Sequence, residues 1–319
     1  MDLSVSVGAV ELPNPVMTAS GTAGHGAELG AFMDLSALGA VVVKSLSAQA
    51  WAGNPAPRLA PAAAGMLNSV GLQNPGMSAW CAEDLPALAR SGARVVVSVW
   101  GRSPGEYAEV GELLVRGLAG AGEDLRRHVV AVEANISCPN VEDRQRMFAH
   151  SRQATASALS ALIGALAPSH LAVWAKLSPN VTDLVAIAGA ALDAGAAGLT
   201  LVNTLMGMAV DPRTGRPVLG AGGGGLSGPA LHPVAVRAVW ECRRAFPDAP
   251  IIGVGGVTTG HDAAELLAAG ADAVQVGTAS FADPRACSRV LAGLQRWCED
   301  QQVLSMAELR ERWATPALG

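Results

Sequence analysis

The chain has 319 residues, of which 50% are hydrophobic and 15% charged, and its formal net charge is −5. This length allows one large α/β barrel or two ordinary domains. The acidic balance and the lack of a basic run argue against nucleic acid and anionic membranes as partners, and no apolar run approaches the roughly 20 residues of a membrane-spanning helix.

The cysteines and the first residues indicate the compartment. The five cysteines include no CxxC pair, so we expect no zinc ion and no iron–sulfur cluster in this chain. Met1-Asp2-Leu3-Ser4 has neither the basic nor the apolar segment of a secretory signal. An odd number of cysteines without such a signal is typical of a reducing compartment. We therefore expect a cytoplasmic protein without a metal site.

Strand-like and helix-like segments alternate along the chain. Apolar or β-branched runs cover residues 16–21, 40–45, 94–101, 129–138, 172–178, 198–204, 251–257 and 273–279. Helical periodicity is found at 107–118, 154–166, 183–194, 229–246 and 262–269, and again near the C-terminus at 287–297 and 306–313. Eight such repeats predict an α/β fold, a single (β/α)8 TIM barrel domain spanning residues 1–319. A doubly wound sheet is the alternative, but it needs fewer strands or a second domain.

Two connections are too long to be simple turns. Residues 47–72 carry three prolines, and residues 205–227 are rich in glycine and proline. Both follow the C-terminal ends of predicted strands, where the active-site loops of barrels lie. We expect them to be long inserted loops at the C-terminal face.

The two lysines are placed unusually. Lys44 and Lys176 are the only lysines among the 22 basic residues, and each lies at the end of an apolar run. A charge there is costly unless it is paired with an anionic group, and lysine makes a more compact point charge than arginine. The alternative is that both side chains extend to the rim of the protein.

The stretch Asn135-Ile136-Ser137-Cys138-Pro139-Asn140 follows the fourth predicted strand. Cys138 is its only group that titrates near neutral pH, since a free thiol has a pKa of about 8.5. The amides of Asn135 and Asn140 both donate and accept, which suits a planar ligand edged with carbonyl and N–H groups. The alternative is a small buried cysteine before a turn.

Three glycine-bearing turns cluster late in the chain. They are Gly225-Leu226-Ser227-Gly228 before Pro229, Gly255-Gly256-Val257, and Gly277-Thr278. Glycine allows close approach of the backbone, and the N–H groups at a helix start attract anions. The last two turns follow the seventh and eighth predicted strands, where barrels often hold a phosphate. We expect a phosphate-bearing cofactor here, with ordinary turn glycines as the alternative.

Seven motifs in one order resemble the dihydroorotate dehydrogenases, namely the soluble class with a cysteine base (class 1) and, within it, the NAD-linked 1B catalytic subunits. The resemblance spans residues 12–284 and is carried by Ala19-Ser20-Gly21-Thr22, Asn68 through Gly76, Asn135 through Val141, Lys176 through Asp183, Asn203 through Met208, Gly225 through Pro229, and Gly277-Thr278.

The resemblance implies an FMN-bound barrel that oxidises dihydroorotate to orotate in pyrimidine biosynthesis. Cys138 would be the catalytic base that removes the C5 proton, while hydride passes to FMN. The implied substrate-binding residues are Lys44, Asn68, Ser69, Gly71, Leu72, Asn135, Asn140, Asn203 and Thr204. The implied cofactor-binding residues are Ala19, Ser20, Gly21, Lys44, Ser45, Asn135, Lys176, Val202, Gly228, Gly255, Gly256, Gly277 and Thr278.

The resemblance also implies partners. The NAD-linked enzymes pass electrons to a second subunit that carries FAD and a 2Fe–2S cluster, and the family forms homodimers or heterotetramers. The final acceptor, NAD through this partner or another such as fumarate, stays open.

The chain departs from the family pattern at two places. Ser98-Val99-Trp100-Gly101 replaces the usual Asn-Val-Ala-Gly, which puts one flavin contact in doubt, and Arg144-Gln145 replaces a Gly-Gly pair in the loop after Cys138. Two alternative functions fit part of the pattern. A dihydropyrimidine dehydrogenase-like flavoenzyme acting on dihydrouracil usually has Pro-His after its cysteine, whereas this chain has Pro139-Asn140. A flavin-binding barrel without turnover would not require Cys138 and both lysines.

Overall fold

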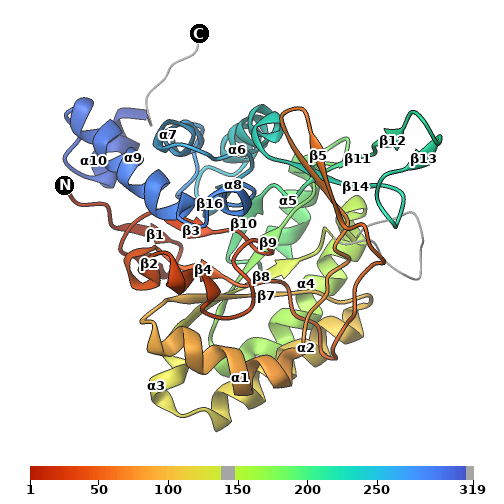
Figure 1. Cartoon of the computed structure of the whole chain (residues 1–319). Helices are drawn as coiled ribbons and strands as arrows, with labels where there is room; N and C mark the ends of the chain where they lie inside the picture. Colours follow the sequence, from red (N-terminus) through yellow and green to blue (C-terminus); the bar gives the residue numbers. More distant parts are fainter. Residues whose placement is uncertain (138–147, 314–319) are drawn as a thin grey trace.

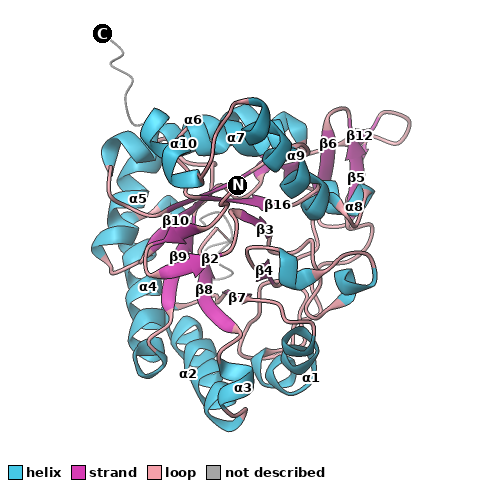
Figure 2. Ribbon diagram, turned by 90° about the vertical axis from the view of Figure 1, so that its left-hand side faces the viewer, coloured by secondary structure: helices cyan, strands magenta, loops and turns pink. Residues whose placement is uncertain are grey.

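The computed structural model describes residues 1–137 and 148–313, and its centre is a parallel sheet that curls into a barrel (Figures 1 and 2). The sheet order is β3-β16-β15-β10-β9-β8-β7-β4. These strands are β3 Val16–Thr18, β4 Val41–Val42, β7 Val95–Val99, β8 Val129–Asn135, β9 Ala172–Lys176, β10 Gly198–Leu201, β15 Ile251–Val254 and β16 Ala273–Val276. A bridge between Met17 and Ala40 joins the two edge strands. The predicted (β/α)8 barrel is confirmed.

Helices surround the barrel, as Figure 2 shows. They are α1 Met77–Arg90, α2 Pro104–Gly120, α3 Glu123–Arg126, α4 Arg152–Leu166, α5 Leu184–Asp193, α6 His232–Ala245, α7 Gly260–Ala268, α8 Ala279–Ala282, α9 Ala286–Asp300 and α10 Met306–Trp313. Short 3-10 turns lie at η1 Glu28–Ala31, η2 Leu35–Ala37, η3 Phe148–His150, η4 Ala167–Ser169 and η5 Pro229–Leu231. The sequence itself places several helix starts, because Ser103, Asp183 and Thr259 each accept a hydrogen bond from a backbone N–H of the first turn. In the described part of the chain, no helix is both long and apolar enough to cross a membrane.

Each predicted helical range contains a helix of the structure, and one range differs at its start. The range 229–246 begins as the 3-10 turn η5 and continues as α6 from His232. Helices α1, α3 and α8 lie outside the predicted ranges. Helix α1 carries Pro86 in its interior, and proline there usually indicates the end of a helix, while α3 and α8 are single turns of four residues.

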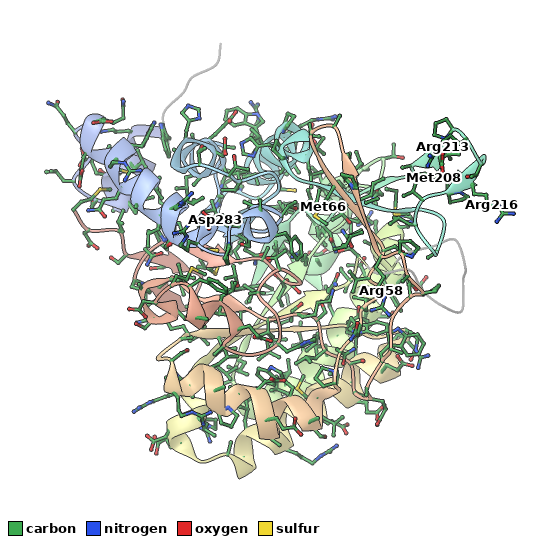
Figure 3. All side chains as sticks on the ribbon, in the orientation of Figure 1. Arg58, Met66, Met208, Arg213, Arg216 and Asp283 are labelled. Carbon is green, nitrogen blue, oxygen red and sulfur yellow. The ribbon has the colours of Figure 1, made fainter. Side chains whose placement is uncertain are left out.

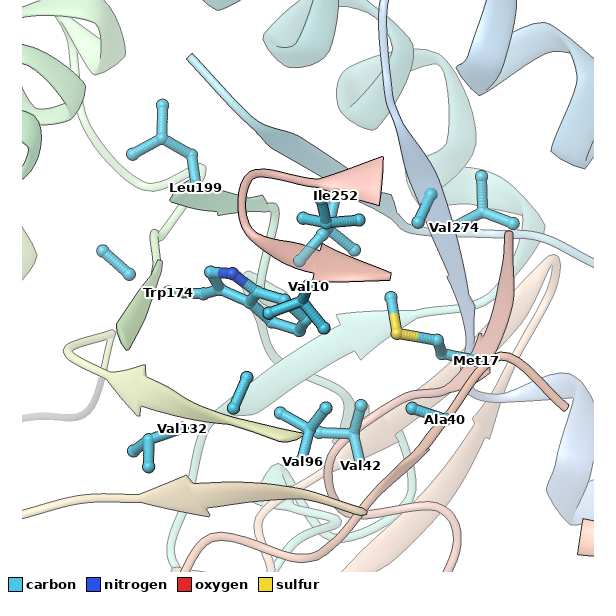
Figure 4. Packing of buried hydrophobic residues seen from close by; sticks show 14 of the residues in the cluster. Val10, Met17, Ala40, Val42, Val96, Val132, Trp174, Leu199, Ile252 and Val274 are labelled. Carbon is cyan, nitrogen blue, oxygen red and sulfur yellow. The ribbon is translucent and has the colours of Figure 1, made fainter. Parts of the chain in front are cut away.

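The half of the barrel interior nearer the N-terminal ends of the strands is filled with apolar side chains. The hairpin of β1 Val5–Val7 and β2 Val10–Leu12 lies across its N-terminal end, and its Val10 belongs to the same buried apolar cluster as Trp174 (Figure 4). Trp174 is fully buried on β9. Side chains alternate along a strand, so Lys176, two residues further on, points to the same side of β9 as Trp174 but lies nearer the C-terminal end of the barrel.

A second sheet covers part of the C-terminal end of the barrel. It comprises β5 Leu59–Ala62, β6 Gly65–Asn68, β11 Leu205–Gly207 and β14 Gly224–Ser227, paired antiparallel in the order β11-β14-β6-β5. The two long connections predicted as loops therefore pair with each other. Next to this sheet, β12 Val210–Asp211 and β13 Arg216–Pro217 form a small hairpin, near whose end Arg213 and Arg216 are seen in Figure 3.

Candidate active site

A cavity of about 410 Å³ opens among the strand ends and the second sheet. Its volume lies in the range of small-molecule sites, roughly 300–1,000 Å³. Every sequence-predicted site residue that the structure describes lines this cavity: Ala19, Ser20, Gly21, Lys44, Ser45, Asn68, Ser69, Gly71, Leu72, Asn135, Lys176, Val202, Asn203, Thr204, Gly228, Gly255, Gly256, Gly277 and Thr278. Cys138 and Asn140 lie outside the described residues, as do Arg144 and Gln145.

The charge of the cavity wall is positive. Among the described lining residues, Lys44 and Lys176 are the only charged side chains, and no carboxylate is present. The remaining wall combines amides, hydroxyls and backbone with many apolar side chains, among them Leu59, Val202 and Phe281. Such a surface suits an anionic ligand that also presents carbonyl and N–H groups.

The Lys176 ammonium group contacts two buried polar side chains, Glu133 and Gln275. Its Nζ lies 3.3 Å from Glu133 Oε1 and 3.4 Å from Gln275 Oε1, and Gln275 Nε2 donates to Glu133 Oε2 at 2.8 Å. Lys176 is 4% exposed, and Glu133 and Gln275 are fully buried. The ammonium group is therefore paired where water has little access, as buried charges generally are. The alternative interpretation, in which the Lys176 side chain extends to the rim, is wrong.

A chain of hydroxyl and amide groups leads from Glu133 to the cavity wall. Ser98 Oγ lies 3.5 Å from Glu133 Oε1 and 2.9 Å from Ser45 Oγ. Asn135 Nδ2 donates to Ser45 Oγ at 3.0 Å, and Asn203 Nδ2 donates to Asn135 Oδ1 at 3.2 Å. The amides of Asn135 and Asn203, which come from different parts of the barrel wall, are thereby fixed with respect to each other.

Lys44 follows β4 and directly precedes Ser45, a member of the hydroxyl chain. Its backbone N–H donates to the Gly24 carbonyl at 2.9 Å. A Cβ added to Gly21, whose φ is +92°, would lie 3.3 Å from Lys44 Nζ. The Lys44 side chain therefore packs over the backbone of Gly21, where a larger residue would crowd it. Burial lowers the pKa of nearby His25, and the positive charge of Lys44 lowers it further. His25 is therefore neutral at pH 7 and leaves Lys44 as the positive charge there.

The glycine turns line one end of the cavity and pack tightly against the chain behind them. A Cβ on Gly255 would lie 2.7 Å from the Cβ of Ala235, and one on Gly256 would lie 2.9 Å from the Gly228 carbonyl. Gly228, Gly255 and Gly256 all have positive φ, so the turns require glycine for both space and conformation. Thr278 Oγ1 donates to Ser227 Oγ at 2.7 Å beside them. This end offers backbone and hydroxyl groups to a ligand, as phosphate sites do.

The described residues that depart from the family pattern do not line the cavity. Ser98 is fully buried and belongs to the hydroxyl chain. Trp100 is 3% exposed and packs edge-on against Trp51 at a centroid distance of 6.2 Å. In the described part of the chain, Trp100 Nε1 has no hydrogen-bond partner.

The four described cysteines are buried, and none lines the cavity. Burial raises the pKa of Cys81, Cys287 and Cys298 to about 11 and that of Cys242 to about 12. Protonated thiols are poor bases and nucleophiles at neutral pH. Of the five cysteines, this leaves Cys138, whose chain neighbour Ser137 does line the cavity.

Sequence reasoning missed Glu133, Gln275 and Ser98 as members of one buried polar group. The signal that could have indicated them is a polar side chain inside an otherwise apolar strand. Glu133 and Asn135 are also two residues apart on β8, so they share one face of the strand.

Comparisons with known proteins agree with this site. The family model described as "Dihydroorotate dehydrogenase" matches residues 2–297. Proteins named "Dihydroorotate dehydrogenase B (NAD(+)), catalytic subunit" are similar at 45% identity in Geobacter sulfurreducens and 46% in Pelobacter propionicus, over 97% of both chains in each case. The protein of that name from Alkaliphilus metalliredigens is 45% identical over 97% of this chain and 98% of its own. The family match and these relatives show that the chain belongs to the dihydroorotate dehydrogenase family.

Proposed function

We propose that this chain is the catalytic subunit of an NAD-linked dihydroorotate dehydrogenase, which uses FMN to oxidise (S)-dihydroorotate to orotate in pyrimidine biosynthesis. One observation carries the proposal: Lys44, Asn68, Asn135 and Asn203 meet in a single cavity that also contains Lys176 and the glycine turns. Relatives with nearly the same length bear this activity in their names.

The cavity fits FMN in its donor set. The glycine turns at Gly228, Gly255, Gly256 and Gly277, together with Thr278, leave backbone and hydroxyl donors at a crowded end of the cavity, and they would hold the phosphate. Lys176 would lie at the N1/C2 carbonyl edge of the flavin ring, where a positive charge stabilises the reduced form. Ala19, Ser20, Gly21, Ser45 and Val202 would line the ring. When bound, FMN supplies the hydride acceptor.

The substrate would be held through its carboxylate and ring amides. The Lys44 ammonium and the Asn68 amide would bind the carboxylate, with Ser69, Gly71 and Leu72 beside it. Asn135, Asn140 and Asn203 would bind the ring amides, with the Thr204 hydroxyl next to Asn203. The Cys138 thiolate would remove the C5 proton, while the adjacent ring carbon gives up hydride.

The electrons would leave through a partner. The relatives are named as catalytic subunits, which supports a second subunit, and we propose that it carries FAD and a 2Fe–2S cluster and passes electrons to NAD. The assembly would be a homodimer or heterotetramer in the cytoplasm, and residues 1–319 would form a single domain.

Anaerobic mixing tests the proposal. Purified protein reconstituted with FMN is mixed with dihydroorotate or with dihydrouracil, and the visible absorbance of the oxidised flavin is followed. We expect bleaching by dihydroorotate alone, and loss of that response in Lys44→Met, which removes the carboxylate partner. Protein that binds no flavin would refute the proposal, and bleaching by dihydrouracil alone would assign the chain to the dihydropyrimidine enzymes instead.

A further inference from the structure

Glu133 is a buried charge to which the proposed function gives no role. Its side chain is fully buried, and toward the described residues its carboxylate oxygens act as hydrogen-bond acceptors. Oε1 accepts from Lys176 and from Ser98, and Oε2 accepts from Gln275. These three partners come from β9, β7 and β16, so the carboxylate joins separate parts of the barrel wall.

The carboxylate sets the direction of the hydroxyl chain above it. Ser98 donates to Glu133 Oε1 over 3.5 Å, a long contact to a charged acceptor, and this leaves it to accept from Ser45, 2.9 Å away. Ser45 has then used its own proton and can only accept in its other contacts. It accepts from Asn135 Nδ2 at 3.0 Å and is 3.1 Å from the Ser20 hydroxyl.

The same direction continues to the amides on the cavity wall. Because Asn135 Nδ2 is turned to Ser45, its Oδ1 accepts from Asn203 Nδ2 at 3.2 Å. The oxygen of Asn203 then accepts from the Thr204 backbone N–H at 2.8 Å. The buried acceptor two hydroxyls away thus sets which end of the Asn135 amide faces Ser45. The Asn203 amide is also held locally, by the Thr204 N–H and by Ser137 Oγ, which lies 3.1 Å from Asn203 Nδ2 and 3.2 Å from Asn135 Oδ1.

Glu133 also lies directly behind the ammonium of Lys176, at 3.3 Å. At this distance in a poorly hydrated site, its negative charge offsets much of the positive field that Lys176 directs into the cavity.

We propose that Glu133 is a positioning residue, which orients the Asn135 amide, the hydrogen-bond partner of Asn203, through Ser98 and Ser45 and balances the Lys176 charge that faces the flavin. The inference rests on the proposed function, because it assumes that FMN and the substrate ring occupy this cavity.

The pairing with Gln275 allows a sharp test. In Glu133→Gln, the new amide nitrogen must face either Lys176 or Gln275; if Gln275 turns to accept from it, the Gln275 amide nitrogen faces Lys176 instead. Donors therefore oppose each other in either arrangement. The exchange E133Q/Q275E removes this conflict, since the amide introduced at position 133 donates to the carboxylate introduced at position 275 and both side chains present an oxygen to Lys176. The exchange keeps the charge and the number of hydrogen bonds.

The experiment compares wild type, E133Q, E133Q/Q275E and S98A in the FMN-loaded protein. The readouts are the flavin midpoint potential without substrate and the Kd of orotate from its perturbation of the flavin spectrum. In E133Q we expect the ratio of reduced to oxidised flavin at fixed potential to rise at least tenfold, a shift of about +30 mV for two electrons, and the Kd of orotate to rise at least tenfold. In E133Q/Q275E we expect both values within threefold of wild type.

S98A separates the two effects and decides the matter if E133Q does not fold. It breaks the hydroxyl chain but leaves Glu133 and Lys176 paired, so we expect a three- to tenfold weaker affinity for orotate with an unchanged midpoint potential. Wild-type values in both E133Q and S98A, or a folded exchange variant that resembles E133Q, would overturn the role of Glu133. Wild-type protein that retains no FMN once the unbound excess is removed by gel filtration would instead contradict the proposed function.

Discussion

Replacing Lys176 by methionine should destabilise the protein strongly. Methionine has a similar length but no charge, so the substitution leaves the fully buried Glu133 carboxylate with only neutral hydrogen-bond donors, Gln275 and Ser98, among its described partners. Breaking a buried ion pair by removal of one member costs about 3–5 kcal/mol, because a charge is left uncompensated. We expect a loss of this size in the free energy of unfolding of Lys176→Met.

A second substitution tests the cause. In K176M/E133Q no uncompensated charge remains, so more than half of the lost free energy should return. The matched control is Arg237→Met, since Arg237 pairs with Glu241 at 2.8 Å on an exposed helix face, with 77% of its side chain accessible. Exposed pairs contribute little, and we expect a change within about 0.5 kcal/mol.

The assay is urea denaturation followed by tryptophan fluorescence, on protein freed of flavin so that ligand binding does not contribute to the midpoint. A K176M variant that unfolds at the wild-type urea concentration would refute the reasoning. So would a double variant as unstable as the single one, because the loss would then come from packing and not from the charge of Glu133.

Three further predictions concern the cofactor and the thiols. Gly277→Ala should weaken FMN binding at least tenfold and leave the melting temperature nearly unchanged, because the added Cβ lies in ordinary contact, 3.4 Å from Ala19. Gly256→Ala should lower both the FMN affinity and the melting temperature, because φ is +68° there and the added Cβ would lie 2.6 Å from His232. Equal melting temperatures for the two variants would contradict this. Cys138→Ala should retain FMN but lose most of the bleaching by dihydroorotate in stopped-flow absorbance, and undiminished bleaching would remove Cys138 from its role. Iodoacetamide at pH 8 should add a single label to the folded protein, as counted by mass spectrometry. Burial raises the pKa of the other four thiols to about 11 or 12, so they stay protonated until the pH rises far above 8. Early labelling of Cys81, Cys242, Cys287 or Cys298 would contradict this prediction.

Much of the fold follows from local patterns in the sequence. Runs such as Val95–Val99 are buried throughout, and a parallel sheet covered on both faces needs such continuous apolar strands. Helix starts are encoded by single side chains, as the capping box of Thr259 and Asp262 shows. Because site residues of a barrel lie at the ends of its strands, the sequence also predicts that Lys44, Asn135 and Lys176 lie at one face.

Other features depend on contacts between distant segments. The pairing of β6 with β14 has no local signature, because glycine-rich strands carry little alternation. Glu133 and Gln275 are fully buried, but a polar residue in an apolar strand does not tell which partner it meets.

The sequence by itself thus determined the order of elements and the face on which the site lies, since both depend on neighbours along the chain. Only the tertiary structure decided that Lys176, Glu133 and Gln275 form one group. Strands β9 and β16 are separated in the sheet by β10 and β15, so their side chains meet across the interior only because the sheet curls into a barrel.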